Sequence, residues 1–339
     1  MRALHTLLLS VIVLISACTG TTTKPDGKPD WIDAHSKHYP AQLYLTGQGS
    51  ADNLNDAKDR ARADLAKQFE VAINERSLQQ QQYDKQQQGE KSSEKLQQSI
   101  SRQLITQTTR TVQGIEITDN WKNQTNHKHY ALAVLSRNKA KQNFEQQIKT
   151  LDQQSQQKLR QAESETDKLK KSALVQQAIE SQLKRQSVQS ALQVVDTSGR
   201  GKPAIISLAE LIRTRDSLIN KITISPNTTG ALAQQLQTIV SGNSANAGFQ
   251  INTDGQSDYS LIAEVKLDSP LKKNQWFWLR GTLEIRLLDN NGNNIGLQRW
   301  PLKAASVTSE QTEQRLLSDI DDILKKELRK ALLSFGDSN

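Results

Sequence analysis

An apolar run near the N-terminus, which ends at the only cysteine of the chain, constrains the fold most strongly. Residues 7–15 read LLLSVIVLI, follow the basic residue Arg2, and lead within three positions to Cys18. A basic start followed by a short apolar run and small residues is typical of an export signal, and the run is too short for a membrane-spanning helix. We therefore expect residues 1–17 to be a cleaved signal peptide and the mature chain to fold without a disulfide.

The residues before Cys18 resemble the lipobox of bacterial lipoproteins. Ile15, Ser16 and Ala17 precede the cysteine, which in such proteins carries diacylglycerol and an acylated amino group. The resemblance implies lipidation at Cys18, with fatty acids such as palmitate. A multiply acylated terminus stays bound to the membrane because each methylene buried in the lipid contributes about 0.8 kcal/mol. Thr19 follows in place of aspartate, which in similar lipoproteins of Gram-negative bacteria implies the outer membrane, facing the periplasm. An ordinary signal peptide is the alternative.

The charge of the chain bears on its partners. The formal net charge is +8 and the pI is about 9.4. In a cytoplasmic protein this charge would favour nucleic acid, because lysine and arginine release counterions from phosphate backbones. An exported chain meets anionic lipid headgroups and cell-wall polymer instead. We expect no nucleic-acid partner, attachment to the outer membrane through the lipid, and an envelope protein or cell-wall polymer as partner.

The first part of the chain predicts a tether and a small α/β domain. Residues 18–30 are rich in threonine, lysine, glycine and proline and predict a flexible tether; the domain is expected over residues 31–140. It should contain a strand at 43–45, a long helix with an alanine-rich apolar stripe, and extended segments at 100–112, 114–121 and 129–137, the last two as a hairpin. Between the first strand and the helix, Gly47 and Gly49 predict a tight turn. The alternative, a phosphate-binding loop, lacks its third glycine.

The order of several motifs in this region resembles the LPP-twenty family of bacterial lipoproteins. The motifs PDWI, LYLTGQGSA, IEITDNW and YALAVLSRNKA, with the alanine-rich helix, cover roughly residues 29–145. The resemblance implies an outer-membrane-associated lipoprotein, in some members linked to flagellar or surface assembly, and carries no catalytic set. The matching positions look structural: Trp31, Gly47, Gly49, Ala57, Ala61, Trp121, Tyr130, Ala131 and Leu132.

Residues 141–220 predict a helical linker or hairpin. Apolar residues recur at spacings of three and four on an otherwise polar surface, from Phe144 to Ala173 and again from Val175 to Val195. The stripe can dock on the preceding domain, pair with a second helix of the same chain, or form a coiled coil between copies. Interruptions by polar residues favour pairing within the chain. The oligomeric state stays open.

Residues 221–339 predict a second α/β domain, so the expected fold class is α+β, with two small sandwiches of a sheet on helices joined by a long helical segment. The expected order is a strand, a helix over 228–240, a short strand at 249–252, three longer strands and a helix over 309–333. This order loosely resembles the periplasmic domains of penicillin-binding-protein activator lipoproteins and of the curli-secretion lipoprotein.

Candidate catalytic and metal sites are weak. His35 with His38 and His127 with His129 have spacings that could place two imidazoles on one metal, but no third ligand with a recognised spacing accompanies them. Ser136 and Lys139 match the S-x-x-K spacing of penicillin-recognising enzymes, without the partner motifs. We therefore expect no cofactor, no metal and a non-enzymatic role in flagellar, surface or cell-wall machinery. An envelope hydrolase or glycan-processing enzyme is the alternative.

The strand QWFWLRGTLEIRL carries the candidate partner-binding residues. Alternation places leucines and isoleucine on one face, and Trp276, Trp278 and Arg280 on the other. Two tryptophans beside an arginine could stack on a sugar ring or anchor a protein. The alternative is structural: a helix or Trp300 covers both rings.

Overall fold

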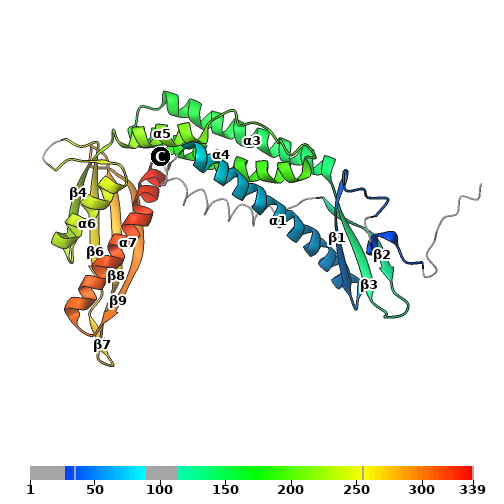
Figure 1. The fold of residues 1–339 in the computed structure, drawn as a ribbon. Coiled ribbons are helices and arrows are strands. Elements are labelled where there is room, and N and C mark those ends of the chain that lie inside the picture. The colour runs from blue at the N-terminus through cyan, green and yellow to red at the C-terminus, as the bar shows by residue number, and fades with distance from the viewer. Residues whose placement is uncertain (1–26, 34–35, 89–113, 254–255, 338–339) are drawn as a thin grey trace, which may run out of the picture. The chain divides into compact units, whose positions relative to one another are not determined.

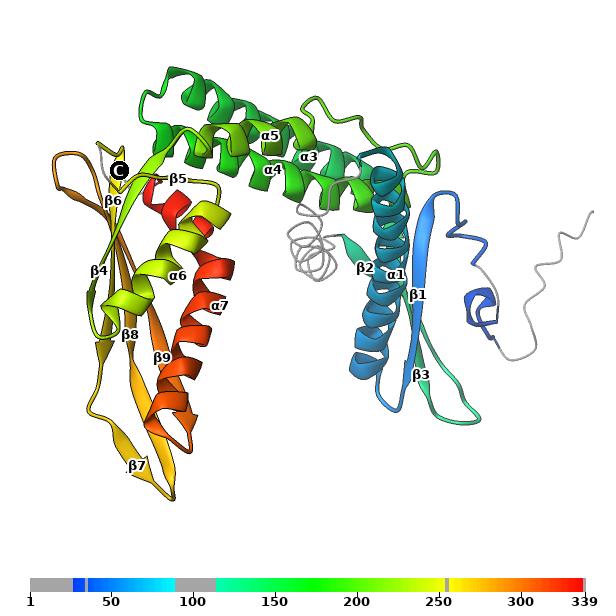
Figure 2. The same cartoon turned by 60° about the vertical axis from the view of Figure 1, so that its left-hand side comes forward.

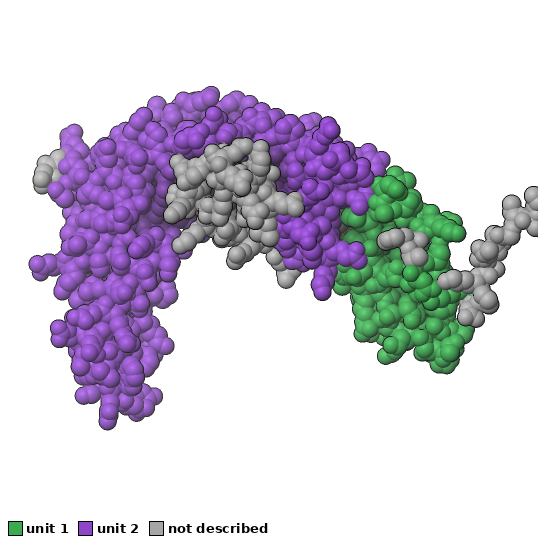
Figure 3. Space-filling view, in the orientation of Figure 1, with its two compact units in different colours: residues 1–65, 115–135 green, residues 66–114, 136–339 purple. Residues whose placement is uncertain are grey.

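The computed structural model describes residues 27–33, 36–88, 114–253 and 256–337 (Figure 1). The predicted signal peptide, Cys18 and the extended segment at 100–112 lie outside these residues. Two compact units divide the chain: residues 1–65 with 115–135, and residues 66–114 with 136–339 (Figure 3). Among the described residues, no helix has the length and apolar character needed to cross a membrane.

Unit 1 is built on a three-stranded sheet of order β1-β3-β2. Strand β1 (Tyr44–Ala51) precedes helix α1 (Leu54–Gln88), which continues into unit 2. Strands β2 (Ile115–Lys122) and β3 (His129–Ser136) pair antiparallel, which confirms the predicted hairpin. The 3-10 turn η1 (Asp30–Ile32) precedes the sheet.

The predicted glycine turn is wrong, because Gly47 and Gly49 lie inside strand β1. A Cβ added at Gly47 would lie 2.5 Å from the backbone nitrogen of Leu65, and one at Gly49 would lie 2.3 Å from the carbonyl oxygen of Ala57. These neighbours are backbone atoms, which cannot move aside as a flexible side chain can. The G-x-G spacing therefore marks a close approach of strand and helix rather than a turn or a phosphate-binding loop.

An aromatic cluster forms a second core of unit 1. Trp31 is buried, and its indole Nε1 donates a hydrogen bond to Oδ2 of Asp119 at 2.6 Å. The Trp121 and Tyr130 rings lie with their centroids 5.5 Å apart. These aromatic residues pack with one another and with Leu132 and Val134 of strand β3. The whole cluster consists of Trp31, Ile32, Tyr39, Tyr44, Trp121, Tyr130, Leu132 and Val134.

Unit 2 begins with a helical hairpin. Helices α3 (Arg137–Ser164) and α4 (Lys168–Val195) pack along each other, and α5 (Leu208–Ile219) lies against α4 (Figure 1). This confirms the predicted pairing within the chain. Their shared core contains Ala162, Val175, Ala178, Ile179, Leu183 and Leu211. A buried ion pair also joins the two long helices, with Arg185 Nε 2.9 Å from Asp152 Oδ1.

The C-terminal part of unit 2 is a six-stranded sheet with two helices. Strands follow the order β5-β4-β6-β8, and β8 also pairs with β7 and β9. Their bounds are β4 (Thr223–Gly230), β5 (Gln250–Ile251), β6 (Tyr259–Leu267), β7 (Leu271–Lys273), β8 (Trp276–Leu288) and β9 (Asn294–Ser306). The helices are α6 (Ala233–Asn246) and α7 (Ser309–Phe335).

The predicted start of the first helix in this part, at residue 228, is wrong. Thr228 to Gly230 continue strand β4 and pair with Ala263 to Val265 of β6, because β-branched threonines suit a strand. The chain then turns at Gly230 and Leu232, which have positive φ values of 79° and 60°. Helix α6 begins only after this turn.

Both helices pack on one face of the sheet (Figure 2). The core between them includes Leu236 of α6, Leu316 and Ile320 of α7, and Leu283 of β8. Leu169 of α4 belongs to this same core and not to the α3–α4 interface. The fold is thus α+β, with sheets packed on helices.

Candidate functional site

The candidate site is the outer face of the C-terminal sheet, meaning the face opposite α6 and α7. Leu279, Leu283, Ile285 and Leu287 of β8 are buried on the helix side, as the alternation predicts. The alternate positions face the other way. Trp276 is 43% exposed, Trp278 is partly buried and Arg280 is exposed.

The register of the neighbouring strands shows which residues flank the tryptophans. Trp278 lies opposite Leu271 of β7 and Ala305 of β9, and Arg280 lies opposite Lys303. The Lys303 ammonium lies 5.2 Å from the centroid of the Trp278 ring, a cation–π contact.

Trp300 does not cover these rings. It pairs with Leu283 and packs against the core, so it lies on the helix side of the sheet. Within the described part of the chain, the two helices that pack on this sheet also lie on that side. Among the described residues, Trp300 and the helices α6 and α7 therefore do not lie over Trp276 or Trp278.

A buried carboxylate neutralised by cations lies farther along the same face. Glu284 is 4% exposed, and its carboxylate lies 2.7 Å from Arg299, 3.3 Å from Arg286 and 3.5 Å from Lys266. The hydrogen bond from Arg299 lowers the pKa of Glu284 by more than burial raises it, so the pKa lies below its ordinary value. A carboxylate held ionised in this way fixes three strands together and is a poor proton donor at neutral pH.

A shallow hollow lies beside the start of α7. Its lining consists of Ser306, Gln311, Gln314, Arg315 and Ser318. Ser306 and Gln311 hydrogen-bond each other at 3.0 Å, and Arg315 donates to the carbonyl oxygen of Ala305. This lining contains hydroxyl, amide and guanidinium groups but no side chain suited to act as a general base.

The S-x-x-K spacing has a structural explanation. The Ser136 hydroxyl accepts a hydrogen bond from the backbone N–H of Lys139 at 3.4 Å and caps helix α3. The spacing of three residues is that of an N-cap and the donor it satisfies.

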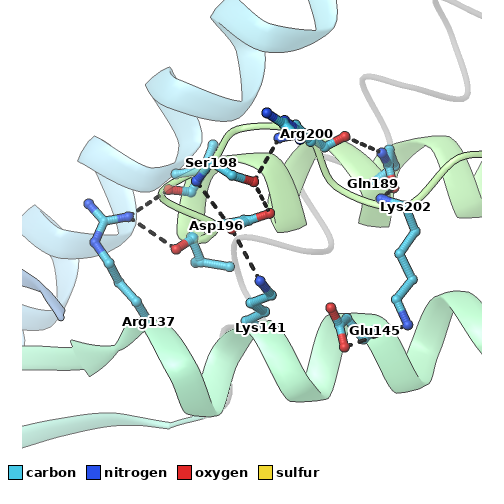
Figure 4. A network of polar contacts seen from close by, with 10 residues as sticks. Arg137, Lys141, Glu145, Gln189, Asp196, Ser198, Arg200 and Lys202 are labelled. Carbon is cyan, nitrogen blue, oxygen red and sulfur yellow. Dashed lines mark hydrogen bonds and ion pairs between the residues drawn. The ribbon is translucent and has the colours of Figure 1, made fainter. Parts of the chain in front are cut away.

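Polar contacts near this cap fix the loop that follows α4 (Figure 4). Arg137 donates to the carbonyl oxygen of Val194 at 2.7 Å, and Lys141 pairs with Asp196 at 3.2 Å. Ser198 donates to Asp196 and is the main reason why the pKa of that carboxyl lies below its ordinary value. These contacts join the start of α3 to the end of α4. The polar groups involved bind one another.

The histidine pairs form no metal centre in the described residues. His127 is exposed and lies in the β2–β3 turn, with His129 at the start of β3, whereas His35 lies outside the described residues. Over the described ranges, no group of three or more His, Cys, Asp or Glu side chains is placed to hold a metal ion.

Residues 29–136 match the family model described as LPP20 lipoprotein. This segment is an LPP20 lipoprotein domain. The match spans strands β1, β2 and β3 and helix α1, and the family is a lipoprotein family. The family positions inferred to be structural include Trp31 and Gly49, and both lie in the packing of the LPP20 domain.

Three solved structures are similar to the chain at low identity. The secreted protein HP1454 from Helicobacter pylori is 14% identical, with 83% of this chain and 96% of that chain covered and a TM-score of 0.44. A minor lipoprotein from Acinetobacter baumannii is 20% identical over 33% of this chain and 92% of that chain, with a TM-score of 0.27. Lipoprotein GNA1162 from Neisseria meningitidis is 11% identical over 30% and 97%, with a TM-score of 0.23. No curated protein matches the chain.

Proposed function

We propose that this chain is a lipid-anchored, non-enzymatic binding component of the bacterial cell envelope. The LPP20 domain supports a lipoprotein, and the sequence before Cys18 supports an anchor at that residue. Delivery to the outer membrane, with the folded units in the periplasm, follows from Thr19 after the cysteine. The envelope process it serves is flagellar, surface or cell-wall assembly.

The binding face is the outer face of the C-terminal sheet at Trp276, Trp278 and Arg280. The observation that carries this assignment is that both rings lie on the side of the sheet opposite α6, α7 and Trp300. An antiparallel sheet needs only one apolar face for its core, so aromatic residues on the other face serve a second contact. Tryptophan and arginine are the residues most enriched at binding hot spots.

The remaining polar clusters support a binding role rather than catalysis. Glu284 is neutralised by three cations, and Ser136 is engaged as a helix cap. The ion pairs of Glu284 and the helix-capping hydrogen bond of Ser136 account for both side chains as structural groups.

Retention on isolated envelopes tests this function. The probe is the chain from residue 18 with Cys18→Ser, so that binding does not depend on the lipid. We expect it to cosediment with washed envelopes, and the double variant Trp276→Ala, Trp278→Ala to lose at least tenfold in retention. Ile205→Ala is the matched control, because Ile205 is 71% exposed but lies in the segment before α5. Equal retention of the double variant and the control would contradict the proposed face.

A further inference from the structure

Exposed apolar side chains gather at one end of the C-terminal sheet. Leu271 is 51% exposed, Trp276 is 43% exposed and Val307 is 56% exposed. Trp276 pairs with Lys273, and Ser306 pairs with Phe277, so Val307 follows next to the start of β8. We call residues 271–278 together with Val307 the hairpin tip.

The hairpin tip is built on a tight turn. Asn274 and Gln275 have positive φ values of 50° and 65° and connect β7 directly to β8. Two central residues with positive φ are the geometry of a two-residue hairpin whose twist matches its strands. Every residue from 268 to 276 is exposed. Figures 1 and 2 both show β7 at the far end of this sheet.

The hairpin tip is basic as well as apolar. Residues 271–278 contain Lys272 and Lys273 and no acidic residue. The Lys272 ammonium lies 4.8 Å from the centroid of the Phe277 ring, and Lys303 lies over Trp278. Cations and aromatic rings are therefore interleaved over the same few residues.

We propose that the hairpin tip binds an anionic phospholipid surface. This inference rests on the proposed function and names the partner class of its binding face. Tryptophan and lysine are the side chains that suit the headgroup layer, where the ring is apolar with a polar edge and the ammonium meets phosphate. Exposed Leu271 and Val307 add aliphatic area that a sugar ring would not need.

The shape of the hairpin tip also favours a surface over a small ligand. Small-molecule sites are concave and enclose most of the ligand, whereas this hairpin protrudes from the sheet. A lipid anchor at Cys18 would raise the effective concentration of membrane around the chain, so a second contact can be weak and still be occupied.

Vesicle sedimentation tests the proposal with the chain from residue 18 carrying Cys18→Ser. The probes are vesicles of phosphatidylcholine alone and of an equal mixture of phosphatidylcholine and phosphatidylglycerol. We expect binding to the mixed vesicles, weaker binding at high salt because the Debye length shortens, and little binding to phosphatidylcholine. Lys272→Glu with Lys273→Glu should reduce binding by about thirtyfold, since each basic residue near an anionic surface contributes roughly fivefold. Trp276→Ala should reduce it as well.

The matched control is Lys325→Glu with Lys326→Glu. These lysines are exposed on α7, and the change in net charge is the same. Equal loss in the two lysine variants would overturn the proposal, because binding would then follow net charge and not the tip. Absence of binding to mixed vesicles, or equal binding to both vesicle types, would also overturn it. If vesicle binding fails while envelope retention still depends on Trp276, the partner is a protein or cell-wall polymer and the proposed function stands; if both fail, the function fails too.

Discussion

Gly49 of β1 lies directly against Ala57 of α1: a Cβ on the glycine would stand 2.3 Å from the carbonyl oxygen of the alanine. Ala57 and Ala61 are fully buried. The small side chains of the helix therefore pack against the glycine backbone of the strand. The LPP20 domain therefore depends on a contact that leaves no space for a methyl group.

Gly49→Ala should destabilise the LPP20 domain. Overpacking of this kind typically costs about 1–3 kcal/mol, and the clashing atoms here are backbone, so we expect a loss near the upper end. Thermal unfolding of the chain from residue 18 measures it. Gly242→Ala is the control, because a Cβ at that position in α6 meets nothing within 4 Å and alanine favours a helix by about 1 kcal/mol. Equal melting temperatures for Gly49→Ala and the unchanged chain would contradict the close packing.

This contact shows where sequence reasoning fails. The hairpin of β2 and β3, the pairing of α3 with α4 and the inward face of β8 follow from apolar periodicity, which reports burial directly. Gly47 and Gly49 predict a turn because glycine is common in turns, although glycine also occurs where two backbones approach closely. Leu169 could not be assigned to the C-terminal core, since periodicity places a residue on a face but does not say which element covers that face.

The pH dependence of stability should reveal the ion pair that ties α4 to the C-terminal sheet. Asp258 accepts from Lys168 at 2.7 Å and from the backbone N–H of Thr223 at 2.8 Å. Burial opposes ionisation of Asp258, but these hydrogen bonds outweigh it and hold its pKa below the ordinary value. The stabilisation is thus present above the ordinary pKa of about 4 and is lost as the pH falls through the lowered value.

Asp258→Asn should therefore lower the free energy of unfolding by about 1–2 kcal/mol at neutral pH. The difference from the unchanged chain should begin to shrink as the pH falls below about 4, where the unfolded chain takes up the proton, and should vanish below the lowered pKa of the native carboxyl. Urea unfolding at a series of pH values measures this. Asp319→Asn, at an exposed position of α7, should show no such trend. A constant difference at all pH values would mean that the carboxylate charge is not what stabilises the contact.

Cys18→Ser in the full chain tests the predicted anchor. Without the thiol, no diacylglycerol can be attached, so the precursor should accumulate with altered electrophoretic mobility and lose outer-membrane fractionation. Fractionation and labelling with a radioactive fatty acid measure both effects. Normal labelling and localisation of this variant would show that the anchor lies elsewhere.

The chain from residue 18 with Cys18→Ser should be a monomer. Phe144, Ile148 and Ala162 of the α3 stripe are buried within the chain, Ala162 in the core shared with α4 and Phe144 stacked on Phe69 of α1, which leaves little for a coiled coil between copies. Light scattering over a range of concentrations measures the mass. A dimer mass that does not change on dilution would contradict this expectation.

The candidate site was predictable only in part. Alternation along β8 separates Trp276 from the core, but Leu271 and Val307 come from segments that sequence reasoning did not connect with it. The sequence LKKNQWFW does contain the signal, since two polar residues between short alternating segments are typical of a hairpin. Register decides what meets across a sheet, and turn geometry fixes the register.

Comparison of Trp276→Ala with Trp300→Ala tests the central claim most directly, because the two tryptophans lie on opposite faces of one sheet. Melting temperature and envelope retention are measured for both variants. The account predicts opposite outcomes: Trp276→Ala keeps its melting temperature and loses retention at least tenfold, whereas Trp300→Ala loses about 3 kcal/mol of stability and, while folded, is retained normally. If Trp276→Ala melts early, or is retained as well as the unchanged chain, the outer face is not the binding face.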